Sequence, residues 1–178
     1  TTRPRAPSRV RSNPTINRIY QNTLWGVRGN YRSIPTDCPQ RDERQGWLGD
    51  RSAESKGETY LFDIAALYAK WVRDMADAQK ESGSIPDVCP SYWPLYNDSV
   101  TWPSSAVIIP GSLYDQYGDA RVLARQYLSM AKWVDYMSGF GSAALFDPVS
   151  GNLSAVFARF TEAGFTLLLF VTPAWHAL

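Results

Sequence analysis

The sequence predicts an all-α fold. Apolar residues recur at the i, i+3, i+4 spacing of amphipathic helices in four segments, and no segment shows the alternation expected of a β-strand. Long and short connections separate the helical segments in turn. This alternation is typical of paired helices in a bundle or a toroid, in which the loops at one end build the site.

Composition and charge exclude several classes of function. The 178 residues suffice for one domain or a piece of one, and 44% hydrophobic residues can supply a sizeable core. A net charge of +1 gives no electrostatic basis for binding nucleic acid or an anionic membrane. The longest strongly apolar run, residues 167–171, is far too short to span a bilayer. The single histidine, His176, leaves carboxylates as the candidates for acid–base chemistry. Two cysteines, Cys38 and Cys89, make neither a disulfide scaffold nor a zinc site.

The first predicted helix follows an N-terminal flank. Residues 1–11 contain four arginines and no apolar period, which favours an unstructured end. Residues 12–14 then supply a capping residue and an early proline. Gly29 and Asn30 are expected to end the helix. Its apolar face comprises Ile16, Ile19, Tyr20, Thr23, Leu24 and Val27.

The strongest helical pattern lies in the middle of the chain. Residues 51–58 have a helix-compatible composition, and Asp63 is expected to cap the next helix or to lie in its first turn. About five turns are expected, ending near Gly83. The apolar stripe consists of Ile64, Leu67, Tyr68, Trp71, Val72 and Met75.

Two further helices are predicted after a long irregular segment. Residues 104–105 are expected to cap the first of them, and Pro110 is expected to kink it. Asp119 caps the second, which Gly139 ends. The apolar face of the second is Leu123, Tyr127, Met130, Val134 and Met137.

A charged segment, residues 35–50, is the feature around which the chain is organised. It combines four carboxylates, two guanidiniums, an indole and a thiol, and its prolines and glycines indicate an ordered loop. Hydrogen-bonding carboxylates, a cation that keeps them ionised and an aromatic face are what a polyhydroxylated ligand needs. A structural cluster of ion pairs on a tight loop is the alternative.

A second irregular segment, residues 84–103, is rich in proline, tryptophan and tyrosine and is almost uncharged. Loops of this length are usually functional or disordered, and the aromatic content argues against disorder. Two interpretations stay open, a wall on which sugar rings stack and a hydrophobic lid over the core.

Several motifs resemble the bacterial α-L-rhamnosidases of glycoside hydrolase family seventy-eight. The strongest is Pro-Thr-Asp-Cys-Pro-Gln-Arg-Asp-Glu-Arg at residues 35–44, followed by Gly-Trp at 46–47 and Gly-Asp at 49–50. Leu-Trp-Gly at 24–26 and Ile-Pro-Asp-Val at 85–88 also look like that family. We therefore predict that residues 12–140 are an N-terminal part of that catalytic domain, with residues 1–11 and 141–178 as flanks.

The resemblance implies a fold, a reaction and a set of site residues. The fold is part of an (α/α)6 toroid, built of helical hairpins with long functional loops, and the reaction is inverting hydrolysis of terminal α-L-rhamnosides. The family's proton donor falls on Glu43. Its sugar-binding groups fall on Asp37, Arg41, Asp42, Trp47, Asp50 and Trp102. The implied partner is a rhamnose-containing glycoside or polysaccharide. No metal, cofactor, nucleic acid or membrane partner is expected, and the compartment of this bacterial protein (cytoplasmic, periplasmic or secreted) is left open.

An inverting reaction also needs a second carboxylate about 6.5–9.5 Å from the first. The acids that follow the second loop are Asp115, Asp119, Asp135, Asp147 and Glu162, and none lies in a segment like the family's base motif. The chain also has residues for only about half of a twelve-helix toroid. These observations predict a fragment without its general base, which is inactive alone and associates through exposed apolar helix faces.

Three other functions are compatible with the sequence. A non-catalytic sugar-binding fragment would keep the loop carboxylates and aromatic residues. A glucuronyl hydrolase or a trehalase-like enzyme on the same toroid is a second alternative, because Arg41 and Arg44 could bind an acidic sugar. A protein-interaction helix bundle is the third, and it leaves the composition of residues 35–50 unexplained.

Overall fold

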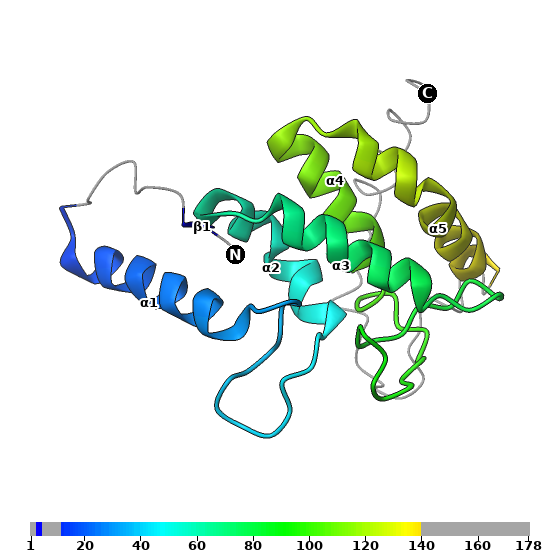
Figure 1. Ribbon diagram of the computed structural model, residues 1–178, viewed down its shortest axis with the longest axis horizontal. Coiled ribbons are helices and arrows are strands. Elements are labelled where there is room, and N and C mark those ends of the chain that lie inside the picture. Colours follow the sequence, from blue (N-terminus) through cyan, green and yellow to red (C-terminus); the bar gives the residue numbers. More distant parts are fainter. Residues whose placement is uncertain (1–2, 5–11, 140–178) are drawn as a thin grey trace.

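The computed structural model describes residues 3–4 and 12–139, which form five helices and one pair of very short strands (Figure 1). The helices are α1 (Pro14–Asn30), α2 (Leu48–Leu61), α3 (Ala65–Asp77), α4 (Ser105–Tyr117) and α5 (Ala120–Ser138). The strands are β1 (Arg3–Pro4) and β2 (Phe62–Asp63). The predicted all-α class is confirmed. In this part of the chain, no helix is both long and apolar enough to cross a bilayer.

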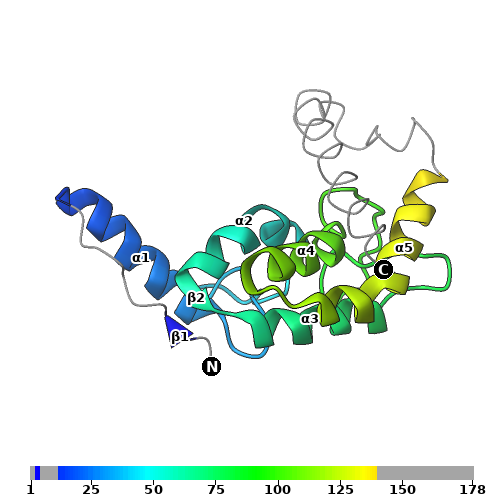
Figure 2. The ribbon, with the colours of Figure 1, turned by 90° about the horizontal axis from the view of Figure 1, so that it is seen from above.

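Helix α1 begins as its sequence predicts but stands apart from the others (Figures 1 and 2). The Asn13 side chain accepts hydrogen bonds from the backbone N–H groups of Thr15 and Ile16, and Pro14 is the first helical residue. Of the predicted apolar face, only Val27 is buried, whereas Ile16 and Ile19 are 50% and 59% exposed. The described residues therefore leave most of this stripe uncovered.

The strand pair corrects two predictions. Strands β1 and β2 are antiparallel, with Arg3 opposite Asp63 and Pro4 opposite Phe62. The prediction that the chain has no strand is wrong, and so is the placement of Asp63 in the first turn or at the cap of a helix. Pairing with β1 holds Phe62 and Asp63 extended, so that α3 begins at Ala65 with Ile64 at the N-cap.

Helix α3 carries the core stripe that its spacing predicts. Tyr68, Trp71, Val72 and Met75 are all buried on one face. The helix ends at Asp77 rather than near Gly83, so the predicted length is too great. Between Asp77 and Gly83 the chain forms a turn, in which Lys80 N donates to Ser84 O over 2.9 Å and Gly83 N donates to Lys80 O over 3.0 Å.

Helix α4 lies at the centre, packed against α2, α3 and α5 (Figure 2). Its sequence is apolar on nearly all sides, which suits a helix enclosed by others. Pro110 lies inside the helix and is buried. Ser104 is the N-cap residue, but its hydroxyl donates to Val100 O instead of accepting from the helix, so the predicted side-chain cap is not made.

Helix α5 is capped as predicted, but its buried face is rotated from the predicted one. The Asp119 side chain accepts from Arg121 N over 3.0 Å, and Gly139 is the C-cap. Three residues of the helix are buried, namely Val122, Gln126 and Trp133. The five residues of the predicted stripe are half-buried beside them.

Candidate active site

Two loops, residues 31–47 and 78–104, carry the predicted site residues other than Asp50, and both extend below the helices in Figure 1. Backbone hydrogen bonds join them. Cys89 N donates to Gly46 O and Leu48 N donates to Asp87 O, each over 2.9 Å, and Trp47 forms an isolated β-bridge with Val88. The approach at Gly46 requires glycine, because a Cβ atom there would lie 2.1 Å from Cys89 O. The two loops therefore form one fixed unit.

The first loop folds back on itself between Asp37 and Gln45. Asp37 N donates to Gln45 O over 2.9 Å, and Gln45 N donates to Asp37 Oδ1 over 2.8 Å. Arg44 adopts a φ of 51°, in the left-handed region that favours glycine, at the residue before this closure. Strained backbone of this kind is found preferentially at functional sites.

This closure brings four of the predicted residues together, with Glu43 between the Arg41 guanidinium and the Trp47 indole N–H. Arg41 Nε lies 2.7 Å from Glu43 Oε2, and the Trp47 indole N–H donates to Glu43 Oε1 over 2.8 Å. Arg41 Nη2 also lies 3.4 Å from Asp37 Oδ2. The Glu43 side chain is 23% exposed, so the carboxylate is fixed yet open to a ligand.

The electrostatics of Asp37 follow from its hydrogen bonds. Burial by itself would raise the pKa of Asp37, but hydrogen bonds from the Cys38 thiol and the Gln45 N–H outweigh it, so the pKa lies below its ordinary value. Asp37 is therefore an ionised acceptor at neutral pH. Such a group can accept hydrogen bonds from sugar hydroxyls.

Asp50 and Trp102 border this group from α2 and the second loop. Helix α2 begins at Leu48, so Asp50 lies in its first turn. The sequence had suggested instead that Asp50 belongs to the loop. Burial raises the pKa of Asp50, and the charges of Asp37, Glu54 and Glu43 add to the effect. The Trp102 ring covers Gly49 so closely that a Cβ atom there would lie 2.4 Å from the ring.

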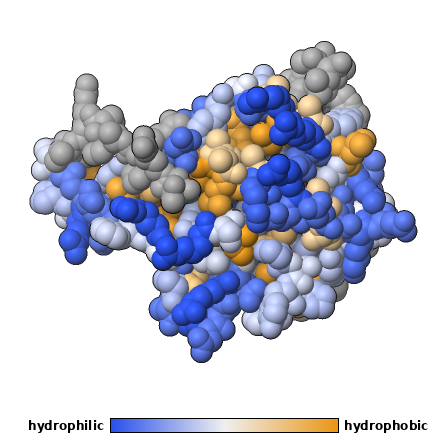
Figure 3. Space-filling view, viewed as in Figure 1, coloured by the Kyte–Doolittle hydropathy of each residue, from blue (hydrophilic) through white to orange (hydrophobic). Residues whose placement is uncertain are grey.

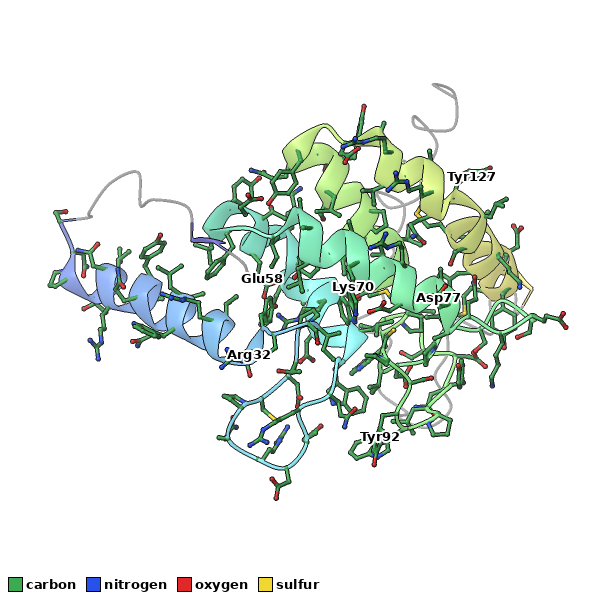
Figure 4. All side chains as sticks on the ribbon, in the orientation of Figure 1. Arg32, Glu58, Lys70, Asp77, Tyr92 and Tyr127 are labelled. Carbon is green, nitrogen blue, oxygen red and sulfur yellow. The ribbon has the colours of Figure 1, made fainter. Side chains whose placement is uncertain are left out.

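The second loop has buried and exposed residues, so the lid interpretation holds for part of it and the sugar-stacking wall stays a prediction. Ile85, Val88 and Cys89 are buried in the core, as a lid would be. Tyr92 and Trp93 are instead 78% and 40% exposed, and Figure 4 places Tyr92 on the outer part of this loop.

Asp42 is the one predicted residue of the first loop that joins none of these hydrogen bonds. Its side chain is exposed, whereas its neighbours Arg41 and Glu43 form an ion pair. Any contact between Asp42 and a sugar would therefore form at the rim of the site.

The ligand atoms of Asp37, Cys38 and Glu43 lie within 4.8 Å of one another, a spacing that could hold a metal ion. Arg41 already brings a positive charge to the same three side chains, with its Nε 2.7 Å from Glu43 and 3.2 Å from Cys38 Sγ. We therefore interpret Asp37, Cys38 and Glu43 as partners of Arg41 and do not propose a metal site there.

A buried polar cluster between the helices was missed by the sequence analysis. The Glu58 carboxylate of α2 accepts hydrogen bonds from Tyr31, at the end of α1, and from Tyr68 of α3, and it pairs with Arg51 (Figure 4 labels Glu58). Arg51 and Glu58 are 6% and 4% exposed. Burial raises the pKa of Glu58, and the Arg51 charge and the Tyr68 hydrogen bond limit the rise. A helix face that carries Arg51, Ser55, Glu58 and Thr59 looks solvated in the sequence, so no local pattern distinguishes the cluster.

Among the described residues, none of the candidates for a second catalytic carboxylate forms a hydrogen bond or an ion pair with Glu43. Asp119 caps α5 and binds Arg121 through two hydrogen bonds, while Asp115 and Asp135 are exposed on α4 and α5. Asp147 and Glu162 lie outside the described residues.

The chain matches a known protein family and several curated relatives. Residues 8–147 match the family described as the bacterial alpha-L-rhamnosidase 6 hairpin glycosidase domain. Among curated relatives, an alpha-L-rhamnosidase from Streptomyces avermitilis is 38% identical over 138 residues, which cover 78% of this chain. An alpha-L-rhamnosidase from Formosa agariphila is 41% identical over 127 residues, which cover 69% of this chain. The chain spans only 13% of the length of each of these two relatives.

Solved structures agree with the sequence comparisons. The structure of the alpha-L-rhamnosidase of Streptomyces avermitilis complexed with L-rhamnose matches with a TM-score of 0.73 and 37% identity over 79% of this chain and 14% of its own. That of an alpha-L-rhamnosidase from Dictyoglumus thermophilum matches with a TM-score of 0.72 and 42% identity, over 74% of this chain and 15% of its own. The helices described above are thus part of an α/α toroid of helical hairpins, as the resemblance implied.

Proposed function

Because this chain belongs to the bacterial α-L-rhamnosidase six-hairpin glycosidase family, we propose that the natural polypeptide carrying it hydrolyses terminal α-L-rhamnosides with inversion. The observation that carries this proposal is the position of Glu43, which lies between the Trp47 indole N–H at 2.8 Å and Arg41 Nε at 2.7 Å. A carboxyl held by one hydrogen bond and one ion pair in a ligand-accessible loop has the fixed orientation that proton transfer requires.

Glu43 is the proposed general acid. A glycosidic oxygen leaves poorly unless it is protonated as the C–O bond breaks, and a carboxylic acid beside the leaving group supplies that proton. In this assignment Glu43 gives its proton to the departing oxygen and ends as a carboxylate. Arg41 and Trp47, already in place, then stabilise the charge that develops on it.

The surrounding side chains form the proposed sugar site. Asp37 and Asp50 accept hydrogen bonds from hydroxyl groups of the rhamnose ring, with Arg41 and Asp42 at its edge. Trp47 and Trp102 offer ring faces to the C–H groups and the C6 methyl of a deoxysugar. The contact of Trp102 with Gly49 supports this arrangement, because it brings that ring to the residue next to Asp50.

The water-activating base has no assignment within residues 12–139. An inverting enzyme places it about 6.5–9.5 Å from the acid. Asp119 is committed to Arg121 and to the cap of α5, and we assign the role to neither Asp115 nor Asp135. The stereochemical course is therefore proposed from the family alone.

A glucuronide substrate is the less favoured alternative. It would require an uncompensated cationic group to bind the sugar carboxylate. Arg41 is paired with both Asp37 and Glu43. Arg44 donates one N–H to the neutral Pro39 O over 3.4 Å, so the glucuronide alternative rests on Arg44 alone.

The test uses the natural polypeptide that carries this sequence. We expect hydrolysis of methyl and aryl α-L-rhamnosides, no hydrolysis of the matching glucuronides, and β-L-rhamnose as the first product by proton NMR. Glucuronide hydrolysis would reject the substrate, and α-L-rhamnose as the first product would reject inversion. Calorimetric titration with L-rhamnose identifies a binding-only protein, which would bind the sugar without turnover.

A further inference from the structure

The Cys38 thiol lies in the middle of the proposed acid's surroundings. Cys38 is 5% exposed, and its Sγ is the acceptor of a hydrogen bond from Arg41 Nε at 3.2 Å. The same nitrogen lies 2.7 Å from Glu43 Oε2. Cys38 Sγ also lies within 4.8 Å of carboxylate oxygens of Asp37 and Glu43. One buried atom thus borders all three charged groups.

Arg41 needs such support because most of its side chain is in solvent. Its side chain is 63% exposed, and an arginine of this kind loses considerable rotamer entropy when it is held in one position. Exposed ion pairs alone contribute about 0–1 kcal/mol and are screened by salt. The contact of Arg41 Nη2 with Asp37 is long, at 3.4 Å. Among the described residues, two partners of the guanidinium are fixed in the protein interior, the Asp37 side chain, which is 7% exposed, and Cys38, and the thiol is the closer of the two, at 3.2 Å from Arg41 Nε.

A thiol suits this place chemically. It is a weak donor and a weak acceptor, so it can donate to the Asp37 carboxylate while accepting from Arg41. The hydrogen bond from Cys38 is one reason why the pKa of Asp37 lies below its ordinary value. The second buried cysteine, Cys89, has no such role, because burial raises the pKa of its thiol to about 12 and its backbone, not its sulfur, contacts the first loop.

We propose that Cys38 is a positioning residue that holds the Arg41 guanidinium against Glu43 and thereby orients the acid towards the leaving group. This inference rests on the proposed function, because it gives Cys38 a part in the same proton transfer. Catalytic groups must be held within about 0.5 Å of their productive position, so a loose Arg41 would cost rate without removing the acid.

The kinetic test uses leaving-group dependence in the natural polypeptide. A 2,4-dinitrophenolate leaves without protonation, whereas a methoxide requires the acid. We expect Cys38→Ala to lower kcat about tenfold to a hundredfold for methyl α-L-rhamnoside, and far less for the dinitrophenyl substrate. Cys38→Ser, which keeps a donor and an acceptor, should restore most of the loss. Cys89→Ala is the matched control and should leave the ratio of the two rates unchanged. An equal loss on both substrates in Cys38→Ala would mean a purely structural role and would overturn the proposal.

A second measurement is independent of activity. The Nε–H signal of Arg41 can be followed by ¹⁵N NMR in the natural polypeptide. We expect it to exchange slowly with solvent in the wild type, Cys38→Ser and Cys89→Ala, and rapidly in Cys38→Ala. Rapid exchange in the wild type, or no change in Cys38→Ala, contradicts the positioning role. A wild-type protein that hydrolyses no rhamnoside contradicts the proposed function instead, while the NMR result still decides whether Cys38 holds Arg41.

Discussion

The Trp47 indole N–H donates to Glu43 Oε1 over 2.8 Å, while the Trp47 backbone is paired with Val88 of the second loop. The residue that orients the proposed acid is therefore fastened to a segment 41 positions later in the chain. A disturbance of the second loop should therefore reach Glu43 through the Trp47 side chain.

Removing the indole N–H tests the link. Trp47→Phe keeps an aromatic face but loses the donor, and we expect kcat for methyl α-L-rhamnoside to fall about tenfold to a hundredfold, because one hydrogen bond to a charged group is worth roughly 1.5–3 kcal/mol. The free energy of unfolding should change by no more than about 3 kcal/mol. Trp93→Phe, at a 40% exposed position in the second loop, is the control. Equal kcat in Trp47→Phe and the wild type would show that the N–H does not orient the acid.

The contact between Gly49 and Trp102 makes a second prediction. A Cβ atom at Gly49 would lie 2.4 Å from Trp102 Cε2, so Gly49→Ala must displace the ring. We expect weaker L-rhamnose binding and a shifted tryptophan emission spectrum. Gly57 lies in the same helix, and a Cβ atom there would meet nothing within 4 Å, so Gly57→Ala should leave binding unchanged and stabilise the helix by roughly 0.5–1 kcal/mol. Unchanged binding in Gly49→Ala would remove Trp102 from the sugar site.

The buried Glu58 predicts a pH dependence of stability. Its pKa in the folded chain lies above the ordinary 4.5, so the folded state binds this proton more readily than the unfolded state does. The contribution of Glu58 to the free energy of unfolding should therefore fall as pH rises from 4.5 through the raised value, and be level outside that window. Urea unfolding as a function of pH measures this contribution.

Substitution at the same residue supplies the control. Glu58→Gln should abolish the Glu58 part of the pH dependence and cost about 1–3 kcal/mol, because Arg51 Nη1 would lose its buried charged partner while Nη2 keeps Glu54. Glu54 pairs with Arg51 at the surface, and its side chain is 63% exposed. Glu54→Gln should therefore lower the free energy of unfolding by less than about 1 kcal/mol. Equal losses in the two variants would show that the buried cluster has no special part in stability.

The uncovered apolar face of α1 predicts association. Ile16 and Ile19 are at least half exposed one helical turn apart, and Figure 3 shows further apolar residues at the surface of the face seen in Figure 1. We expect this chain to form dimers or larger species in light scattering after size exclusion, and the double change of Ile16 and Ile19 to serine to reduce them. Leu128→Ser alters a single 79% exposed apolar residue on α5 and should have little effect. A monodisperse wild-type monomer would contradict the prediction.

Local patterns in the sequence predicted most of the helices. The cap at Asn13 and the stripe of α3 depend on residues within a few positions of one another, which is why spacing reveals them. The two-residue ladder between β1 and β2 joins residues far apart in the chain, Arg3 with Asp63 and Pro4 with Phe62, and is too short to leave a period. Asp63 was misplaced for that reason.

The site divides in the same way. Asp37, Arg41, Glu43 and Trp47 lie within eleven residues of one sequence motif. The structure connects the four side chains by ion pairs and a hydrogen bond. The cluster around Glu58 could not be predicted, because Tyr31 lies 27 positions before it and no local pattern brings them together. The contact of Trp102 with Gly49 is likewise visible only once α2 and the second loop are packed.

The most direct test of the account is the hydrolysis of methyl α-L-rhamnoside by the natural polypeptide with Glu43→Gln. Glutamine keeps the size of the side chain and cannot give up a proton to the leaving group. We predict that kcat falls at least about a hundredfold, while L-rhamnose still binds and Glu81→Gln, at an exposed glutamate outside the site, retains full activity. Unimpaired hydrolysis by Glu43→Gln would contradict the assignment of Glu43 as the acid.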